Sequence, residues 1–203
     1  MSVVIKKLRK EDLNKARKFA VEGMHLHWFT SSKLELYLYS KFFLYSELSK
    51  ATQALGAYMN DDLVGILLAD MNDQPKVSMS FWSKIYISLA SFVMNLSYKN
   101  STDDYDETNK KMLKAYQGHP KTDGELNFFA VDPNIKGKGI GTILLNELEA
   151  REKGKHIYLF TDSGSTYQFY SHRGFKEIGR KEISFDVGGE KVPLVCMLFA
   201  KTL

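Results

Sequence analysis

The sequence has almost no cysteine: Cys196 is the single one among 203 residues. A single cysteine excludes an intramolecular disulfide and a zinc site built from several thiolates. Because Cys196 lies in the apolar run 195–199, we expect a buried structural thiol and not a nucleophile. Residues 1–7 carry no long apolar signal region, so the expected location is a reduced, cytoplasmic compartment.

Long runs of one charge or of apolar residues are also missing. Lysine and arginine number 28 against 24 aspartates and glutamates, a net charge of +4. This mild excess suits a polyanionic ligand, but no basic run or reader motif points to a nucleic-acid partner. The most apolar stretch, 78–98, is interrupted by Lys84, Asn95 and several serines. We therefore expect no membrane span.

The composition is that of a folded chain. Hydrophobic residues make up 44% of the sequence, which excludes a disordered chain, and we expect one domain over residues 1–203. His25 and His27 are spaced as a metal-binding pair, but no carboxylate or cysteine cluster stands beside them. We expect them to pack at a boundary or line a pocket, and we predict no metal site.

One stretch, residues 125–142, predicts a strand, a glycine loop and a helix. The apolar run 126–131 is short enough for one buried strand, and Asp-Pro-Asn at 132–134 ends it. The first turn of the following helix leaves backbone N–H groups unpaired, where a phosphate fits. Glycines let the backbone come close, and lysines add charge. We therefore predict a pyrophosphate site made by Lys136, Gly137, Lys138, Gly139, Ile140, Gly141 and Thr142.

The loop lacks the P-loop pattern, and the dinucleotide pattern would need glycine where Thr142 stands. It resembles the acyl-CoA loop of the GCN5-related N-acetyltransferases, [QR]-x-x-G-x-[GA] after a strand ending Val-x-Pro. Residues 136–141 fill that pattern after Val-Asp-Pro at 131–133. Lys136 departs from the usual Gln or Arg, keeping the charge but losing the planar fork of arginine.

A second block makes the resemblance specific. Residues 167–175, which follow an apolar strand at 156–161, resemble the family's late helix ending in aromatic-Tyr-x-x-x-Gly-Phe. The resemblance implies the acyl-CoA N-acyltransferase fold. This fold is mixed α/β, with a mostly antiparallel sheet of about six to seven strands, splayed between strands 4 and 5, and with helices on both faces.

Residues 74–122 are expected to form a helical insertion before the fourth strand. About fifty residues are too many for a structureless loop, and 78–98 and 106–116 have helical spacing. We predict that the insertion covers the acceptor site or makes a subunit contact, as in a homodimer. The alternative is a helical hairpin without a role.

The resemblance also implies where a thioester would be held. In that fold the pantetheine arm pairs with the fourth strand where it separates from the fifth. By position this involves the backbone of Phe129, Ala130 and Val131, and the Val131 N–H is the best candidate to polarise the thioester carbonyl. The family often places asparagine seven residues before its tyrosine; Ser163 stands there, so its hydroxyl would have to substitute.

Two side chains are the candidate catalytic groups. Tyr170 matches the family tyrosine near the cofactor sulfur and, with a reference pKa of about 10, is protonated at neutral pH and can act as the acid. The alternative is a core tyrosine, and Tyr167 is the second candidate. Glu125 is the candidate base, because strand alternation would place it on the same face as Val131. The alternatives are a solvated carboxylate and a water relay.

The resemblance therefore implies an N-acetyltransferase that transfers an acetyl group from acetyl-CoA to a primary amine of a small molecule or peptide, directly in a ternary complex. A non-catalytic acyl-CoA-binding sensor on the same fold is the alternative. A dinucleotide oxidoreductase is a third hypothesis, supported only by the glycine loop.

Overall fold

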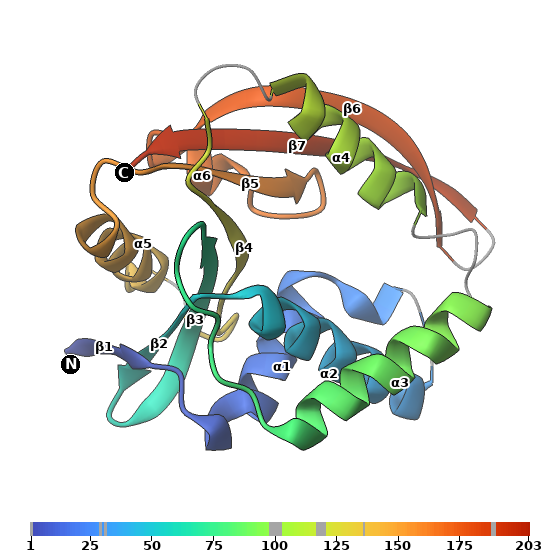
Figure 1. The fold of residues 1–203 in the computed structure, drawn as a ribbon, viewed down its shortest axis with the longest axis horizontal. Coiled ribbons are helices and arrows are strands. Elements are labelled where there is room, and N and C mark those ends of the chain that lie inside the picture. Colours follow the sequence, from blue (N-terminus) through green and yellow to red (C-terminus); the bar gives the residue numbers. More distant parts are fainter. Residues whose placement is uncertain are drawn as a thin grey trace.

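The computed structural model describes residues 2–28, 30, 32–97, 103–116, 121–135, 137–187 and 190–203. Lys136 of the predicted phosphate loop lies outside these residues. The fold is a seven-stranded sheet with helices on both faces (Figure 1). This confirms the predicted fold class.

The sheet has the order β1-β2-β3-β4-β5-β7-β6, in which only β4 and β5 are parallel neighbours. The Asn60-Asp61 turn that joins β2 to β3 has positive φ at both residues, as a two-residue hairpin turn of type I′ requires. The strands are β1 (Val3–Lys7), β2 (Gln53–Met59), β3 (Asp62–Met71), β4 (Gly124–Val131), β5 (His156–Asp162), β6 (Lys176–Val187) and β7 (Glu190–Thr202).

The helices divide between the two faces of the sheet. Apolar residues of α5 (Ile140–Arg151) and α6 (Gln168–His172) pack on one face, and those of α1 (Leu13–Gly23) and α2 (Lys33–Lys50) pack on the other. Short 3-10 helices, η1 (Lys10–Asp12) and η2 (Leu26–Trp28), flank α1.

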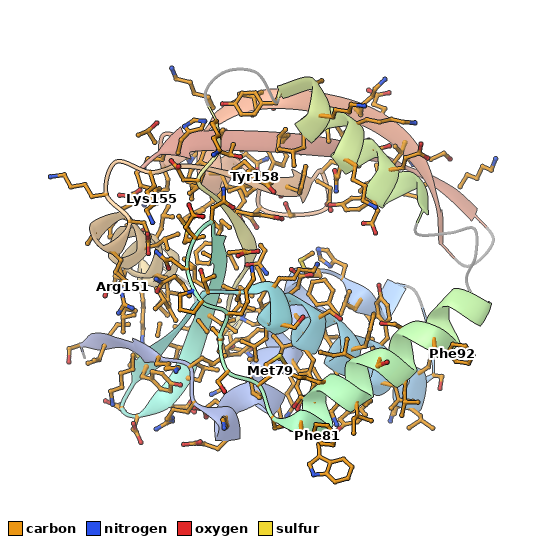
Figure 2. The ribbon with its side chains drawn as sticks, viewed as in Figure 1. Met79, Phe81, Phe92, Arg151, Lys155 and Tyr158 are labelled. Atoms are coloured by element: carbon orange, nitrogen blue, oxygen red, sulfur yellow. The ribbon has the colours of Figure 1, made fainter. Side chains whose placement is uncertain are left out.

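Two further helices lie between β3 and β4 in the chain, where helices were predicted. One of them, α4 (Asp103–Tyr116), covers β6 and β7 (Figure 1). Its Met112 packs against Leu198 of β7, on the face of the sheet that α2 also covers. The other, α3 (Phe81–Ser97), packs along α2, and the Tyr86 hydroxyl donates to the Leu38 carbonyl. Phe81 and Phe92 of α3 face outward (Figure 2). Within the described residues, α3 and the other helices all fall short of the length and apolarity needed to cross a membrane.

The sheet opens between β4 and β5. These strands pair only at Gly124 with Ile157 and at Glu125 with Tyr158, whereas β5 pairs with β7 along its whole length. From Leu126 onward, the edge of β4 that faces β5 has no strand partner in the described chain. The splayed sheet that the resemblance implied is therefore present.

A β-bulge at Asn127 changes which residues of β4 share a face. Leu68 lies opposite Phe128 and Ala69 opposite Leu126, so Asn127 is an extra residue. As a result, Phe128 packs with α1 and α2, while Phe129 and Val131 pack with α5. The alternation assumed from the sequence is therefore broken, and the expectation that Glu125 and Val131 share a face was wrong.

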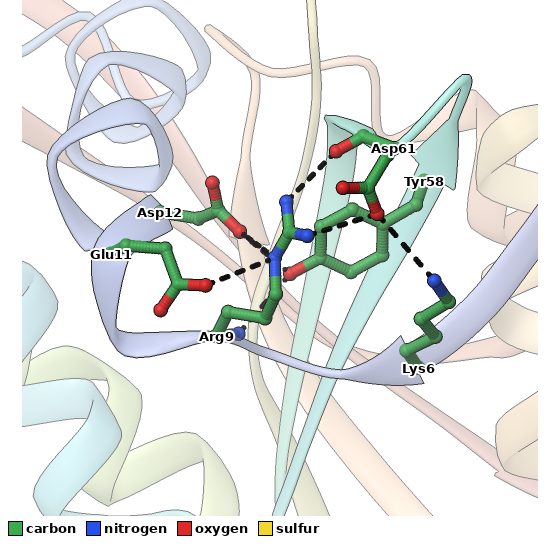
Figure 3. Close-up of polar contacts among 6 residues, drawn as sticks. All are labelled: Lys6, Arg9, Glu11, Asp12, Tyr58 and Asp61. Carbon is green, nitrogen blue, oxygen red and sulfur yellow. Dashed lines mark hydrogen bonds and ion pairs between the residues drawn. The ribbon is translucent and has the colours of Figure 1, made fainter.

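Arg9, which follows β1, links η1 to the turn of the β2–β3 hairpin through hydrogen bonds and ion pairs (Figure 3). Its guanidinium donates to Asp12 at 2.6 Å and to Asp61 at 2.9 Å, which raises the pKa of Arg9 and lowers that of Asp61. The buried Tyr58 hydroxyl accepts from the Arg9 backbone N–H at 3.1 Å and donates to Asp12 at 3.0 Å.

We expect Tyr58→Phe to lower the free energy of unfolding by about 1–2 kcal/mol, because it removes two hydrogen bonds and leaves a partly buried N–H unpaired. Urea denaturation measures this loss. Tyr86→Phe, which removes one exposed hydroxyl, is the control. An unchanged urea midpoint for Tyr58→Phe would mean that water replaces the hydroxyl without cost.

Candidate active site

The predicted glycine loop leads directly into α5. Gly137 and Gly139 have φ of 74° and 65°, and an added Cβ at either would have no atom within 4 Å. The positive φ at these two positions favours glycine, and the space beside them is open. Gly141 has a different reason, because a Cβ there would lie 3.3 Å from the Phe129 ring and 3.4 Å from the Phe169 ring.

The N-terminus of α5 fits an anion. Gly139 is the N-cap and contributes no side-chain cap, and the first backbone N–H bonded inside the helix is that of Ile143, to the Gly139 carbonyl at 3.0 Å. The earlier N–H groups, of Ile140, Gly141 and Thr142, have no carbonyl partner among the described residues. Lys138 is exposed beside them. The described part of the predicted loop can thus hold a phosphate.

The backbone of β4 presents amides to the opening beside β5. The Asp132 N–H donates to the Val64 carbonyl of β3 at 2.9 Å. Because N–H directions alternate along a strand, the Val131 and Phe129 N–H groups point away from β3, into the opening. The Ala130 backbone instead faces β3. Two of the three predicted positions therefore offer an amide, and Ala130 does not.

Tyr170 lies on the α5 side of the opening. Its ring is surrounded by Phe129, Phe169, Phe175 and Phe199, with ring centroids 5.6–6.4 Å away. Burial raises the pKa of the Tyr170 hydroxyl, so the group stays protonated at neutral pH. Within the described part of the chain no group is hydrogen-bonded to this hydroxyl. It is available to donate to a ligand.

Tyr167 and Ser163 are the other two side chains predicted to lie near the cofactor. Tyr167 packs one turn before Tyr170, at the N-cap of α6. Ser163 follows β5 and is exposed, and its hydroxyl accepts from the Val195 N–H at 3.1 Å. Its backbone N–H also pairs with the Val195 carbonyl. Ser163 thus extends the sheet, and its hydroxyl already has a partner.

Glu125 lies on the opposite face of the sheet, toward α2. The Tyr158 hydroxyl of β5 donates to its carboxylate at 3.1 Å. Desolvation raises the pKa of Glu125; the Tyr158 hydrogen bond lowers it, and the neighbouring Glu47 raises it. A carboxylate with a raised pKa is a better proton acceptor. The candidate base and acid therefore stand on opposite faces, with the opening between β4 and β5 separating them.

Sequence reasoning missed Tyr158 and Asn127, both beside Glu125. The Asn127 amide donates to the Glu47 carboxylate at 2.8 Å and to the Glu47 carbonyl at 3.0 Å. Both residues are polar at inward positions of strands that the sequence does predict. That signal could have found both, because alternation from Glu125 already places Asn127 on the same face and the bulge changes only the residues after it.

Cys196 is fully buried, as expected, and burial raises the pKa of its thiol to about 11. A thiol with this pKa is a weak nucleophile at neutral pH. The imidazole of His25 lies 3.0 Å from the Gly164 carbonyl, at the loop after β5. This contact brings the end of α1 to the rim of the opening.

Comparisons with known proteins agree with this geometry. The family model described as acetyltransferase (GNAT) domain matches residues 107–177, from α4 to the start of β6. A search of curated proteins finds no match. Together with the solved structures below, the match confirms the resemblance to the GNAT acetyltransferases.

Solved structures share the fold over the whole chain. Histone acetyltransferase HPA2 and related acetyltransferase from Corynebacterium glutamicum is 20% identical, with a TM-score of 0.58, covering 98% of this chain and 96% of its own. Ribosomal-protein-alanine N-acetyltransferase from Brucella melitensis is 20% identical, with a TM-score of 0.54 and coverages of 98% and 99%. N-acetyltransferase from Staphylococcus aureus is 15% identical, with a TM-score of 0.52 and coverages of 100% and 99%.

Proposed function

We propose that this protein, with its GNAT acetyltransferase fold, is an N-acetyltransferase that transfers an acetyl group from acetyl-CoA to a primary amine. The observation that carries the proposal is the opening between β4 and β5. It lies between the N-terminus of α5, where an anion fits, a tyrosine hydroxyl that no described residue binds, and a carboxylate with a raised pKa. Direct transfer is favoured over a route through Cys196, because that thiol is buried.

The donor half of the site would bind coenzyme A and polarise the thioester carbonyl. The first-turn amides of α5, with Lys138, would hold the diphosphate of coenzyme A. Lys136 would add its charge. The Phe129 and Val131 N–H groups would donate to the pantetheine arm and to the thioester carbonyl, where negative charge develops during transfer. The sequence favours Val131 for the carbonyl; Phe129 has the same orientation and lies beside Tyr170.

The two candidate catalytic side chains move protons. Glu125 accepts the proton that the acceptor ammonium must lose before its nitrogen can attack. The new C–N bond forms as the C–S bond breaks, and the Tyr170 hydroxyl protonates the leaving thiolate. The acylated nitrogen gives its second proton to water, Glu125 releases the proton that it accepted, and Tyr170 regains one from water, so one proton is released per transfer. The products are an acetamide and free coenzyme A.

Thiol release tests the proposal. The protein is incubated with acetyl-CoA and a panel of polyamines, aminoglycosides, amino acids and peptide N-termini, and free thiol is measured. The expected result is release that depends on both acetyl-CoA and an amine. Tight binding of acetyl-CoA without release for any amine would favour the acyl-CoA sensor. Failure to bind acetyl-CoA, with binding of a nicotinamide dinucleotide, would favour the oxidoreductase.

The pH profile should report the environment of Glu125. Because the carboxylate is the active form, kcat/KM should rise with pH through the pKa of Glu125, at a pH above the ordinary value for glutamate. Tyr158→Phe removes the hydrogen bond that favours the charged form. The acidic limb of the profile should therefore shift to higher pH. A profile of kcat/KM that is unchanged in Tyr158→Phe would point to a water relay without Glu125.

A further inference from the structure

The region on the α2 and α4 side of the opening is where an acceptor would approach Glu125, so this inference rests on the proposed function. Tyr39 of α2 and Asp106 of α4 interact across it, and the Asp106 charge contributes to the raised pKa of Tyr39. Tyr158 rises from β5 on the same side (Figure 2). We call the part of the molecule bounded by α2, α4, β4 and β5 the acceptor region.

Carboxylates without a cationic partner gather in the acceptor region. Asp106, Glu125 and Asp162 form no ion pair with any described residue. They differ in this from Glu47 at the same place, which pairs with Lys50 at 2.6 Å. Asp162 accepts from the Tyr105 hydroxyl of α4 at 3.4 Å and from the Gly164 N–H at 2.8 Å. The charge of Lys50 also reaches Glu125 and Asp106, so four carboxylates share this paired lysine and the region keeps a net negative charge.

A second, independent observation is that the elements around the acceptor region carry buried oxygens without a hydrogen-bond partner among the described residues. Three side-chain oxygens are buried without a partner in the described chain, those of Ser46, Asn109 and Asn127. Ser46 is on α2, one turn before Lys50; Asn109 is on α4, one turn after Tyr105; Asn127 is at the bulge beside Glu125. Buried polar atoms rarely remain unpaired in a complete structure.

Asn109 makes this observation strong. Its side chain is only 6% exposed, and it forms a hydrogen bond with Tyr105, whose hydroxyl reaches Asp162. Its amide oxygen, which can only accept, is left without a donor. The amide oxygen of Asn127 is likewise buried without a donor among the described residues. A ligand that suits both ends of the region must therefore bring N–H donors and positive charge together.

The spacing along β5 gives the length of such a ligand. Glu125 is in register with Tyr158, and Asp162 follows four residues later on the same face of the strand. At a strand rise of about 3.3 Å per residue, this separation is about 13 Å. The rings of Tyr158 and Phe160 follow one another along this face of β5, with centroids 5.5 Å apart, and aromatic faces suit both methylene chains and ammonium groups.

We propose that the acceptor is a linear aliphatic polyamine, with one amine at Glu125 and Asn127 and a distal ammonium between Asp106, Asn109 and Asp162. The proximal amine, once neutral, takes the acetyl group and coenzyme A leaves as the thiol. The distal ammonium stays charged and only positions the chain. Acceptors that carry a carboxylate, such as amino acids and acidic peptides, are repelled by the same region.

The test compares spermidine with n-octylamine, a monoamine of similar length, and with lysine, by thiol release. We expect kcat/KM for spermidine to exceed that for either comparison amine at least tenfold. Equal values, or a preference for lysine or an acidic peptide, would overturn the inference and leave the acetyltransferase function standing. No release with any amine, despite acetyl-CoA binding, would remove the proposed function, and the inference with it.

Adjacent residues of α4 provide a matched pair of variants. Asp106→Asn should raise KM for spermidine about fivefold, because a partly exposed ion pair is lost, with kcat and the KM for n-octylamine unchanged. Glu107→Gln is the control, since Glu107 already pairs with Lys111 at 2.8 Å. Calorimetry with the protein saturated with coenzyme A should show weaker spermidine binding in Asp106→Asn and unchanged binding in Glu107→Gln. Equal effects of the two substitutions would overturn the placement of the distal ammonium.

Discussion

Gly139→Glu is expected to weaken acetyl-CoA binding by about thirtyfold or more, because two penalties of over 1 kcal/mol each act together. Gly139 has a φ of 65° at the N-cap of α5, a conformation that residues with a Cβ rarely adopt. The new carboxylate would also stand where the diphosphate is proposed to bind and would itself occupy the helix N-terminus. Isothermal calorimetry with acetyl-CoA measures the loss.

The control for this variant is Gly154→Glu. Gly154 follows α5 at its other end, has a φ of 83°, and offers the same open space for a Cβ. The substitution therefore introduces the same charge and a similar backbone strain, far from the proposed phosphate site. Its affinity for acetyl-CoA should stay near that of the unaltered protein. Retained tight binding by Gly139→Glu would contradict the assignment of the loop.

Tyr170→Phe should lower kcat more than tenfold while leaving acetyl-CoA affinity nearly unchanged. General acid catalysis typically contributes about a hundredfold or more, and part of that can be supplied by water. The ring that packs against Phe129, Phe175 and Phe199 remains in the variant. Because the hydroxyl has no partner in the described chain, stability should not change. Steady-state kinetics and urea denaturation separate the two effects.

Tyr86→Phe controls for the loss of a tyrosine hydroxyl outside the site, since Tyr86 lies on α3 and donates to Leu38. Its kcat should match that of the unaltered protein. Unaltered turnover in Tyr170→Phe would exclude Tyr170 as the acid. Tyr167, one turn earlier, would then be the residue to substitute.

The fold could be predicted from the sequence to a large extent because its main signals are local. The polar turn at Asn60 and Asp61, the apolar strand of β4 and the glycines before α5 each specify the backbone within a few residues. The helices α3 and α4 were predicted from the length of the segment between β3 and β4 and from its helical periodicity. Their packing against α2 and the β6–β7 hairpin depends on contacts distant in the sequence, which periodicity does not report.

The site was predicted less completely, and the bulge is the reason. Strand alternation is a sound rule only while the register is unbroken, and no residue type around Asn127 announces an extra position. The rule therefore placed Glu125 with Val131. It could have pointed to Tyr158, but it gave no sign that the side-chain oxygens of Asn109 and Asn127 would be buried without a partner in the described chain. Residues drawn from α2, α4, β4 and β5 meet only in the folded chain.

The extra residue in β4 has a consequence for how the protein can be altered. Removing Asn127 itself would leave Leu126 opposite Ala69 and Phe128 opposite Leu68, so the ladder would become regular and both apolar clusters would keep their residues. Removing or adding a residue between Phe128 and Val131 would instead turn the side chains beyond it to the other face of the sheet. The strand should therefore accept the loss of Asn127 much more readily than the loss of any residue after it.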